Sequence, residues 1–221
     1  VSAQSLEEWL APLALMSDEV SRLAITYSHP EWIVSAYFDL LRDFEEVRAL
    51  LEANNTPAKP TFVIWPGRSE ISEFDEWGAV STTYSPYGFR AEVTPSALEA
   101  VRHRRAGVQD EGSQLVASIF AQAAAGKNSW LDLCAGPGGK AALLAAIAAQ
   151  GDHRFVANEI SQIRADLVKQ VVGSHEVWVG DARQIATRGE GFDAILADVP
   201  CTGMEALRRR QEVRWQRSLS D

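Results

Sequence analysis

Hydrophobic positions recur at three- and four-residue spacing through much of residues 5–53, which is the pattern of amphipathic helices. One such face carries Trp32, Ile33, Ala36, Tyr37, Leu40, Leu41 and Phe44. Ser28-His29-Pro30 suits the start of this helix, and Asn54-Asn55-Thr56-Pro57 interrupts the pattern. The sequence therefore predicts a helical region that ends near residue 53.

Residues 61–105 show a mixed pattern. Thr61–Trp65 predicts a short strand, because it is a compact apolar run followed by the turn sequence Pro66-Gly67. Ser85–Gly88 predicts a second turn, and Thr94-Pro95-Ser96 suits the start of a short helix that runs through Val101. These signals indicate a small α+β segment but do not define its topology.

From Gly107 onward, short apolar runs alternate with helical patterns. The predicted strands are Ser129–Leu133, Arg154–Asn158, Glu176–Val179 and Ala194–Ala197, and the predicted helices are Ser113–Ala124, Gly139–Ala149 and Ile160–Val172. This alternation implies right-handed crossovers and a parallel sheet with helices on both faces. We predict an α/β fold with a Rossmann-like sheet in a domain at residues 106–221, preceded by a helical and α+β region at residues 1–105.

Composition and charge narrow the class of protein. The net charge of -9 argues against a general nucleic-acid binder, but arginines cluster at residues 102–105 and 208–217. Each cluster is either a solvated helix face or a phosphate-binding surface. The two cysteines favour a reducing compartment and provide no metal-binding spacing. No apolar run approaches the ~18 residues of a membrane helix, so we expect a cytoplasmic protein without a membrane segment or a metal.

The strongest chemical signal is a glycine-rich loop between a predicted strand and a predicted helix. It consists of Cys134, Ala135, Gly136, Pro137, Gly138, Gly139 and Lys140. Glycine allows a tight turn and close approach of a ligand, and the free N–H groups of the following helix can hold an acidic group. The loop could also be a simple turn. Its strand context favours a nucleotide-like site, with the methionine carboxylate of S-adenosyl-L-methionine at the helix start.

Two acidic residues follow the next predicted strands. Glu159 lies twenty residues after Gly139, which is the spacing of a ribose-binding acid, although it could also only stabilise a helix start. Asp181 could accept a hydrogen bond from an adenine amino group, or cap the helix that follows it, or do both. We predict that Glu159 and Asp181 bind the cofactor.

The fourth strand ends in Asp198-Val199-Pro200-Cys201. The carboxyl ends of parallel strands are where open α/β sheets bind ligands. A thiol is most often a buried structural group, but its place directly after a proline at a strand end favours a functional role. We predict catalytic roles for Asp198 and Cys201, and we predict that Asp198 also binds the cofactor.

Four segments together resemble motifs of the Sun/Fmu family of RNA cytosine-5 methyltransferases: Cys134–Lys140, Glu159, Asp181 and Asp198–Cys201. Gly107–Ser113 is similar to the segment that precedes the cofactor loop in that family, and Tyr27–Trp32 and Ala53–Asn55 are similar to its pre-catalytic region. The similarity is most specific over residues 107–210 and points to the members that act on 16S ribosomal RNA. It implies S-adenosyl-L-methionine as cofactor and RNA as partner.

The resemblance also implies a covalent mechanism. A cysteine thiolate adds to carbon 6 of a cytosine, carbon 5 takes the methyl group, and loss of a proton releases the enzyme. Asp198 would hydrogen-bond the base at N3. In this family the attacking cysteine belongs to a later Thr-Cys-Ser motif, and the thiol that corresponds to Cys201 assists product release. We expect the nucleophile beyond Asp221, with Cys201 as the alternative.

Two other functions stay open from the sequence. The same fold could methylate a protein or a small molecule, although such chemistry needs no thiol. The domain could instead be a non-catalytic module that binds RNA or another partner, because the chain has no cysteine after Cys201. The sequence does not define the oligomeric state.

Overall fold

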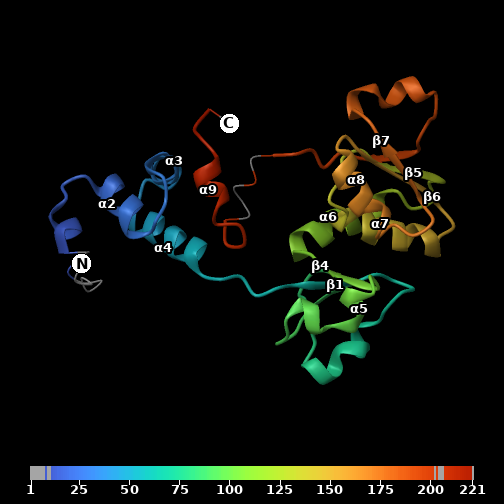
Figure 1. Cartoon of the computed structure of the whole chain (residues 1–221), viewed down its shortest axis with the longest axis horizontal. Coiled ribbons are helices and arrows are strands. Elements are labelled where there is room, and N and C mark those ends of the chain that lie inside the picture. Colours follow the sequence, from blue (N-terminus) through green and yellow to red (C-terminus); the bar gives the residue numbers. More distant parts are fainter. Residues whose placement is uncertain (1–7, 9–10, 202, 204–206, 221) are drawn as a thin grey trace. The chain divides into compact units, whose positions relative to one another are not determined.

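The computed structural model describes residues 8, 11–201, 203 and 207–220. Contacts divide the chain into two compact units (Figure 1). The helical unit contains Val1–Ala58 and Cys201–Asp221, and the sheet unit contains Lys59–Pro200. The expected boundary between residues 105 and 106 therefore lies within the sheet unit, and the functional division there stays a prediction.

The helical region predicted from the N-terminal pattern is present. Its described elements are the 3-10 segment η1 (Ala11–Leu15) and the helices α2 (Glu19–Thr26), α3 (Glu31–Leu41) and α4 (Phe44–Asn55). Asp18 and Asp43 begin α2 and α4 by accepting hydrogen bonds from first-turn N–H groups. Leu23, Val34 and Leu51 are fully buried between the helices. Burial of these apolar side chains stabilises the unit.

The C-terminal segment of the helical unit contains α9 (Val213–Gln216), which the sequence pattern did not reveal. Arg214 in this helix is only 2% exposed. Its Nη1 donates to the carbonyl oxygen of Ser28 at 3.1 Å and to Oδ1 of Asn55 at 2.9 Å. Arg214 is therefore part of neither a solvated helix face nor a phosphate-binding surface, because its side chain is buried and links two distant segments of the chain.

The sheet unit begins with an antiparallel sheet in the order β2-β3-β1-β4. Its strands are β1 (Phe62–Ile64), β2 (Val80–Ser81), β3 (Gly88–Arg90) and β4 (Ala106–Val108), and the connecting segments contain η2 (Ile71–Trp77), η3 (Pro95–Ala97) and α5 (Glu99–Arg102). Stacked rings of Phe62, Phe74 and Phe89 form its core. The sequence predicted β1 and the short helix, but β2, β3 and β4 have only two or three residues and show no periodicity.

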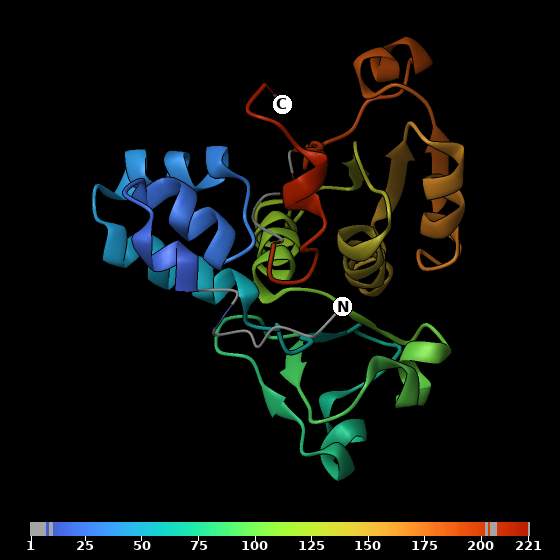
Figure 2. The ribbon, with the colours of Figure 1, turned by 60° about the vertical axis from the view of Figure 1, so that its left-hand side comes forward.

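The predicted parallel sheet is also present, in the strand order β7-β6-β5-β8. Its strands are β5 (Ser129–Asp132), β6 (Arg154–Glu159), β7 (Glu176–Val179) and β8 (Ala194–Leu196). The helices are α6 (Glu111–Ala123), α7 (Gly139–Gln150) and α8 (Gln162–Lys169), with η4 (Ala182–Arg188) between β7 and β8. Helices α6 and α7 lie side by side (Figure 2).

Helices α6, α7 and α8 pack on one face of this sheet. Trp130, Phe155 and Ala157 point to one face, where they share a core with residues of α6, α7 and α8. The chain moves from β5 to β6 to β7 in a single direction, and right-handed crossovers made in one direction place their helices on one face. The connection from β7 to β8, which contains η4, runs in the opposite direction, so the same rule places it on the other face, as the expected fold class requires.

We predict that Arg214 and Asn55 are energetically coupled, because their hydrogen bond joins a charged group that is only 2% exposed to a partly buried amide. A double-mutant cycle of Arg214→Met and Asn55→Ala, measured by urea unfolding of the chain, should give a coupling energy of about 1–2 kcal/mol. The exposed Asn128 provides the control, since Asn128→Ala should add to Arg214→Met without coupling. Additive effects of the first pair would contradict the contact.

Candidate active site

The strand order places a ligand site at the carboxyl ends of the parallel strands. β5 lies between β6 on one side and β8 on the other, so the chain reverses direction across the sheet beside β5. Open α/β sheets bind their ligands in the crevice that such a reversal creates. The loop that follows β5 is the glycine-rich loop singled out from the sequence.

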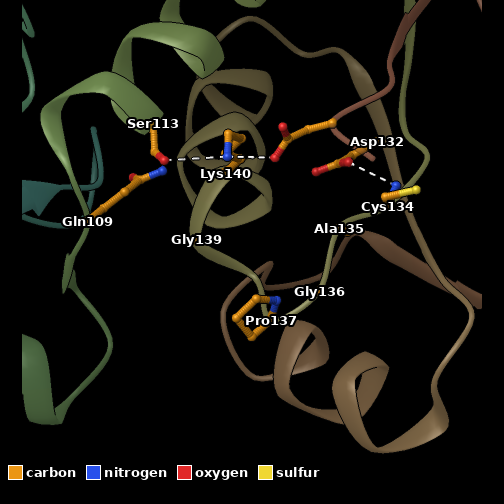
Figure 3. Close-up of a pocket in the computed structure, with 10 residues that line it drawn as sticks. Gln109, Ser113, Asp132, Cys134, Ala135, Gly136, Pro137, Gly139 and Lys140 are labelled. Atoms are coloured by element: carbon orange, nitrogen blue, oxygen red, sulfur yellow. Dashed lines mark hydrogen bonds and ion pairs between the residues drawn. The ribbon is translucent and has the colours of Figure 1, made fainter. Parts of the chain in front are cut away.

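Two cavities occupy this edge of the sheet. The first, which we call the Lys140 cavity, has a volume of about 230 Å³. It is lined by Gln109, Ser113, Asp132, Cys134, Ala135, Gly136, Pro137, Gly139, Lys140 and Asp198 (Figure 3). The second, the Glu159 cavity, has a volume of about 270 Å³. It is lined by Leu133, Cys134, Asn158, Glu159, Ile160, Gly180, Asp181, Ala182, Arg183 and Pro200. Cys134 lines both, so the two cavities adjoin.

Glu159 holds the glycine-rich loop in place. Its side chain is 3% exposed, Oε2 accepts from the Gly136 N–H at 3.0 Å, and Oε1 accepts from the Ser161 N–H at 3.0 Å. Arg164 donates to the Gly136 carbonyl oxygen and approaches the Glu159 carboxylate at 3.8 Å. The sequence predicted Glu159 at this edge, but its hydrogen bond to the loop could only be seen in the structure.

Two glycines of the loop have no room for a side chain. A Cβ atom at Gly136 would lie 2.3 Å from Oε2 of Glu159. Gly138 has a φ of +116° and begins α7 as its N-cap, where a Cβ atom would lie 2.9 Å from Cγ2 of Val171. The tight turn expected from the sequence is therefore present. Cofactor binding by the loop stays a prediction.

Asn158 is a site residue that the sequence reasoning missed. It is 1% exposed, and its Nδ2 donates to the carbonyl oxygens of Leu133 and Gly180, both at 3.0 Å. One amide thus joins the ends of β5 and β7 across β6. Its Oδ1 has no hydrogen-bond partner within the described chain. An asparagine directly before the predicted ribose-binding acid was the only available signal.

Lys140 and Asp198 form an ion pair within the Lys140 cavity. The Nζ atom of Lys140 lies 2.6 Å from Oδ2 of Asp198 and donates to Oγ of Ser113 at 3.4 Å. Figure 3 shows the Lys140 side chain between Ser113 on one side and the carboxylate side of the cavity on the other. The sequence predicted both residues at the site, in separate roles. The structure adds that they contact one another.

Asp132, the last residue of β5, lines the same cavity and was not assigned a role from the sequence. It is 1% exposed, and burial raises the pKa of its carboxyl group to about 7, assisted by the charges of Asp198 and Glu159. Its Oδ1 accepts from the Cys134 N–H at 3.3 Å. Burial, followed by the charge of Asp132, also raises the pKa of the Cys134 thiol. Cys134 is therefore a poor nucleophile at neutral pH, since the thiolate is the reactive form.

Asp181 is the N-cap of η4, which confirms the helix-capping role expected from the sequence. Its Oδ1 accepts from the Arg183 N–H at 2.9 Å, and both carboxylate oxygens accept from the Arg183 guanidinium. These hydrogen bonds lower the pKa of Asp181 to about 2. Asp181 also lines the Glu159 cavity. Adenine recognition by Asp181 remains a prediction, and it would involve movement of the exposed Arg183.

The end of β8 leads into the Asp198–Cys201 motif. Asp198 lines the Lys140 cavity, and Pro200 lines the Glu159 cavity. Cys201 is the first residue of the C-terminal part of the helical unit and is exposed, with the Gly203 N–H 3.4 Å from its Sγ atom. The structure therefore brings together the predicted cofactor residues and Asp198, while the role of Cys201 stays a prediction.

The parallel sheet, the glycine-rich loop and the acidic strand ends define a Rossmann-like domain of the methyltransferase type. Residues 120–221 match the family described as 16S rRNA methyltransferase RsmB/F. This match confirms the resemblance seen in the sequence. Methyltransferases of this family use S-adenosyl-L-methionine.

Curated relatives of this chain are also named as methyltransferases. A protein of Mycobacterium tuberculosis (strain ATCC 25618 / H37Rv) that is named as a methyltransferase, Rv1407, is 38% identical over 232 residues, which cover 100% of this chain and 50% of the relative. The probable ribosomal RNA small subunit methyltransferase B of Bacillus subtilis (strain 168) is 26% identical over 93% of this chain and 48% of its own length. The chain thus spans about half the length of these relatives.

A solved structure confirms the fold. The crystal structure of a methyltransferase homolog protein from Pyrococcus horikoshii aligns with a TM-score of 0.68 and 20% sequence identity. The alignment covers 88% of this chain and 67% of that chain. In the part of the chain that the structure describes, none of the helices is both long and apolar enough to cross a membrane.

We predict that Gly136→Ala destabilises the sheet unit by about 1–3 kcal/mol, because the new methyl group collides with the Glu159 carboxylate. Gly112 is the matched control. It lies in α6 with open space around its Cα, so Gly112→Ala should be neutral or stabilise by about 0.5–1 kcal/mol. Urea unfolding of both variants measures the difference. A Gly136→Ala variant as stable as the wild type would contradict the close contact between Gly136 and the Glu159 carboxylate.

We predict that Asp132→Asn stabilises the chain more as the pH rises. Between pH 4 and pH 7, native Asp132 retains a proton that the unfolded chain releases, so wild-type stability falls over this range. Asn carries no such penalty, and its advantage should grow to about 2–4 kcal/mol at pH 8.

Thermal melts at pH 4.5, 6 and 8 measure this difference between Asp132→Asn and the wild type. The exposed Asp152 provides the control, because Asp152→Asn should show no such growth with pH. An Asp132→Asn advantage that is constant with pH would show that the native carboxyl group titrates normally.

Proposed function

We propose that this chain carries the cofactor site and part of the catalytic site of an S-adenosyl-L-methionine-dependent RNA cytosine-5 methyltransferase that acts on small-subunit ribosomal RNA. The observation that supports this most strongly is the pair of adjoining cavities at one sheet edge. One cavity presents the acids Glu159 and Asp181, and the other presents the Lys140–Asp198 ion pair. A methyl-transfer enzyme must hold its cofactor and its substrate side by side, and two adjoining cavities provide room for both.

The Glu159 cavity suits the adenosine part of the cofactor. Each oxygen of Glu159 accepts one backbone N–H, which leaves a lone pair on each for a ribose hydroxyl. Ile160 and Pro200 provide apolar contacts for a base. Asn158 also lines this cavity, and its buried Oδ1 has no hydrogen-bond partner in the described chain. A hydrogen-bond donor on the ligand would satisfy this atom.

The Lys140 cavity suits the amino-acid end of the cofactor and the reacting base. The start of α7 lines this cavity, and the free N–H groups of a first helical turn attract a carboxylate. Asp198, together with Asp132 when it is ionised, supplies negative charge for an ammonium or a sulfonium group. When bound, S-adenosyl-L-methionine supplies an electrophilic methyl group.

The residues of this cavity can also hold the target base. Asp198 can accept a hydrogen bond from N3 of a protonated cytosine ring, which stabilises the adduct as the thiolate adds to carbon 6. Lys140, 2.6 Å from Asp198, holds the carboxylate in place and supplies a positive charge beside the base. The target base must leave its stack to reach this cavity.

We place the attacking thiolate in a Thr-Cys-Ser segment that follows Asp221 in the full-length protein, and we assign product release to Cys201. Two observations support this assignment. The chain spans about half of its curated relatives, and the raised pKa of the Cys134 thiol makes that cysteine unsuitable as the nucleophile. The exposed arginines Arg208, Arg210 and Arg217 are proposed to contact RNA phosphates.

A methyl-transfer assay tests the proposal. The full-length protein that contains this chain, given labelled cofactor and 16S ribosomal RNA, should place the methyl group on carbon 5 of a cytosine. Asp198→Asn should lower the rate about 10²–10⁴-fold, because the base loses its hydrogen-bonding carboxylate. Asp166→Asn, an exposed charge change on α8, should leave the rate unchanged.

The same assay separates the alternatives. Cys201→Ser should accumulate a covalent protein–RNA complex if Cys201 assists release, whereas loss of both product and complex would make Cys201 the nucleophile. Methyl transfer to protein but not to RNA would contradict the RNA assignment. Cofactor binding without transfer to any substrate would favour a non-catalytic module.

A further inference from the structure

One buried side chain of the Lys140 cavity has no partner. Gln109 is 8% exposed, and neither its Nε2 nor its Oε1 has a hydrogen-bond partner among the described residues. Its backbone is fully used, since the Gln109 N–H donates to the Thr61 carbonyl oxygen at 3.0 Å and its own carbonyl oxygen accepts from Gln114 at 2.8 Å. Burying an amide without partners costs about 1–3 kcal/mol, so a ligand that satisfies the group would recover this energy.

The neighbouring Gln114 shows what a structural glutamine looks like in this fold. It is fully buried, and its Nε2 donates to the carbonyl oxygens of Phe62 and Gln109. Its Oε1 accepts from the Ser85 hydroxyl at 2.6 Å. Every polar atom of Gln114 is therefore occupied within the protein. Gln109, five residues earlier, is also buried, but its side-chain amide has no hydrogen-bond partner among the described residues, so its role differs from the structural role of Gln114.

The position of the Gln109 carboxamide indicates what it could bind. A Cβ atom at Gly139 would lie 3.7 Å from Nε2 of Gln109, so the amide is next to the first residue of α7. Figure 3 shows the Gln109 side chain directed toward Ser113 and Lys140, across the cavity from Asp132 and Cys134. The amide therefore lies beside the N-terminus of α7. The same cavity is lined by two carboxylates, the buried Asp132 and the half-exposed Asp198.

This arrangement matches an α-amino acid. A carboxylate is favoured next to the N–H groups of α7, and the Gln109 amide adds one side-chain donor there. The ammonium group of the same ligand is favoured on the acidic side, near Asp132 and Asp198. A carboxamide carries no charge and both donates and accepts hydrogen bonds, so it suits a zwitterion.

We propose that Gln109 is a specificity residue of the site: its carboxamide binds the carboxylate of the amino-acid end of the cofactor. This inference rests on the proposed function, because it takes S-adenosyl-L-methionine as the ligand. It extends the binding site to the segment between β4 and α6, ahead of the glycine-rich loop. The segment resembled the family in the sequence, but no role had been attached to Gln109.

Calorimetric titration of the chain with two ligands tests the proposal. S-adenosyl-L-methionine has the amino-acid end, whereas 5′-methylthioadenosine has the same adenosine and sulfur without it. Gln109→Leu should weaken S-adenosyl-L-methionine binding about 10–100-fold, the range of a lost hydrogen bond to a charged group. Its affinity for 5′-methylthioadenosine should stay within about twofold of wild type.

Two further variants sharpen the test. Gln109→Glu places a carboxylate beside the ligand carboxylate and should weaken S-adenosyl-L-methionine binding more than Gln109→Leu does. The exposed Gln122 of α6 is the matched control, and Gln122→Leu should bind both ligands as the wild type does. Thermal melts confirm folding, and Gln109→Leu should be at least as stable as the wild type because it removes an unpaired buried amide.

The two titrations distinguish a role of Gln109 in cofactor binding from its alternatives. Equal loss of affinity for both ligands would show that Gln109 only shapes the cavity, and no loss for either would remove it from the cofactor site. Unchanged cofactor affinity with reduced methyl transfer to RNA would assign the amide to the target base instead. A wild-type chain that binds neither ligand would overturn the proposed function itself, whereas a wild type that binds while Gln109→Leu also binds normally overturns only this inference.

Discussion

The hydrogen bond between the Glu159 carboxylate and the Gly136 N–H is the contact on which the rest of the site depends. It links the end of β6 to the glycine-rich loop after β5, at a distance of 3.0 Å. The carboxylate is 3% exposed, so the bond is made away from water and the loop has little freedom to leave it. This contact explains why residue 136 must be glycine, and it places the loop between the two cavities.

Charge is distributed around this contact in a way that suits a cationic ligand. Burial, assisted by the charges of Asp198 and Glu159, raises the pKa of Asp132, while the charge of Lys140 opposes this shift. The Lys140–Asp198 pair keeps one charge of each sign at the cavity wall. A sulfonium cofactor with a zwitterionic tail would complete this set, because it brings two positive charges and one negative charge to a site with an excess of carboxylates.

Periodicity and motif spacing were enough to predict the parallel strands, the loop Cys134–Lys140 and the acids at the strand ends. These features are local: a strand, a turn and the residue that follows it are neighbours in the chain. The sequence could not predict the contacts that join distant segments, such as the Asn158 bridge across β6 or the Lys140–Asp198 pair.

The sequence also could not predict the surroundings of two buried side chains, Arg214 and Gln109. Arg214 read as part of an exposed basic cluster, yet the fold buries it against Ser28 and Asn55, which lie far away in the sequence. Gln109 gave no signal of its own, because an unpartnered amide can be recognised only when the surrounding atoms are known. The strands β2, β3 and β4 escaped prediction because they are short and, unlike β1 and β8, do not lie within a run of apolar residues.

The affinity of the chain for S-adenosyl-L-methionine, compared between the wild type and Glu159→Gln, tests the central claim most directly. The account predicts saturable binding of one ligand by the wild type and a loss of affinity of about tenfold or more in Glu159→Gln, because a neutral amide holds both the loop N–H and a ribose hydroxyl less well. Equal affinity of the two proteins, or no binding by a folded wild type, would contradict it.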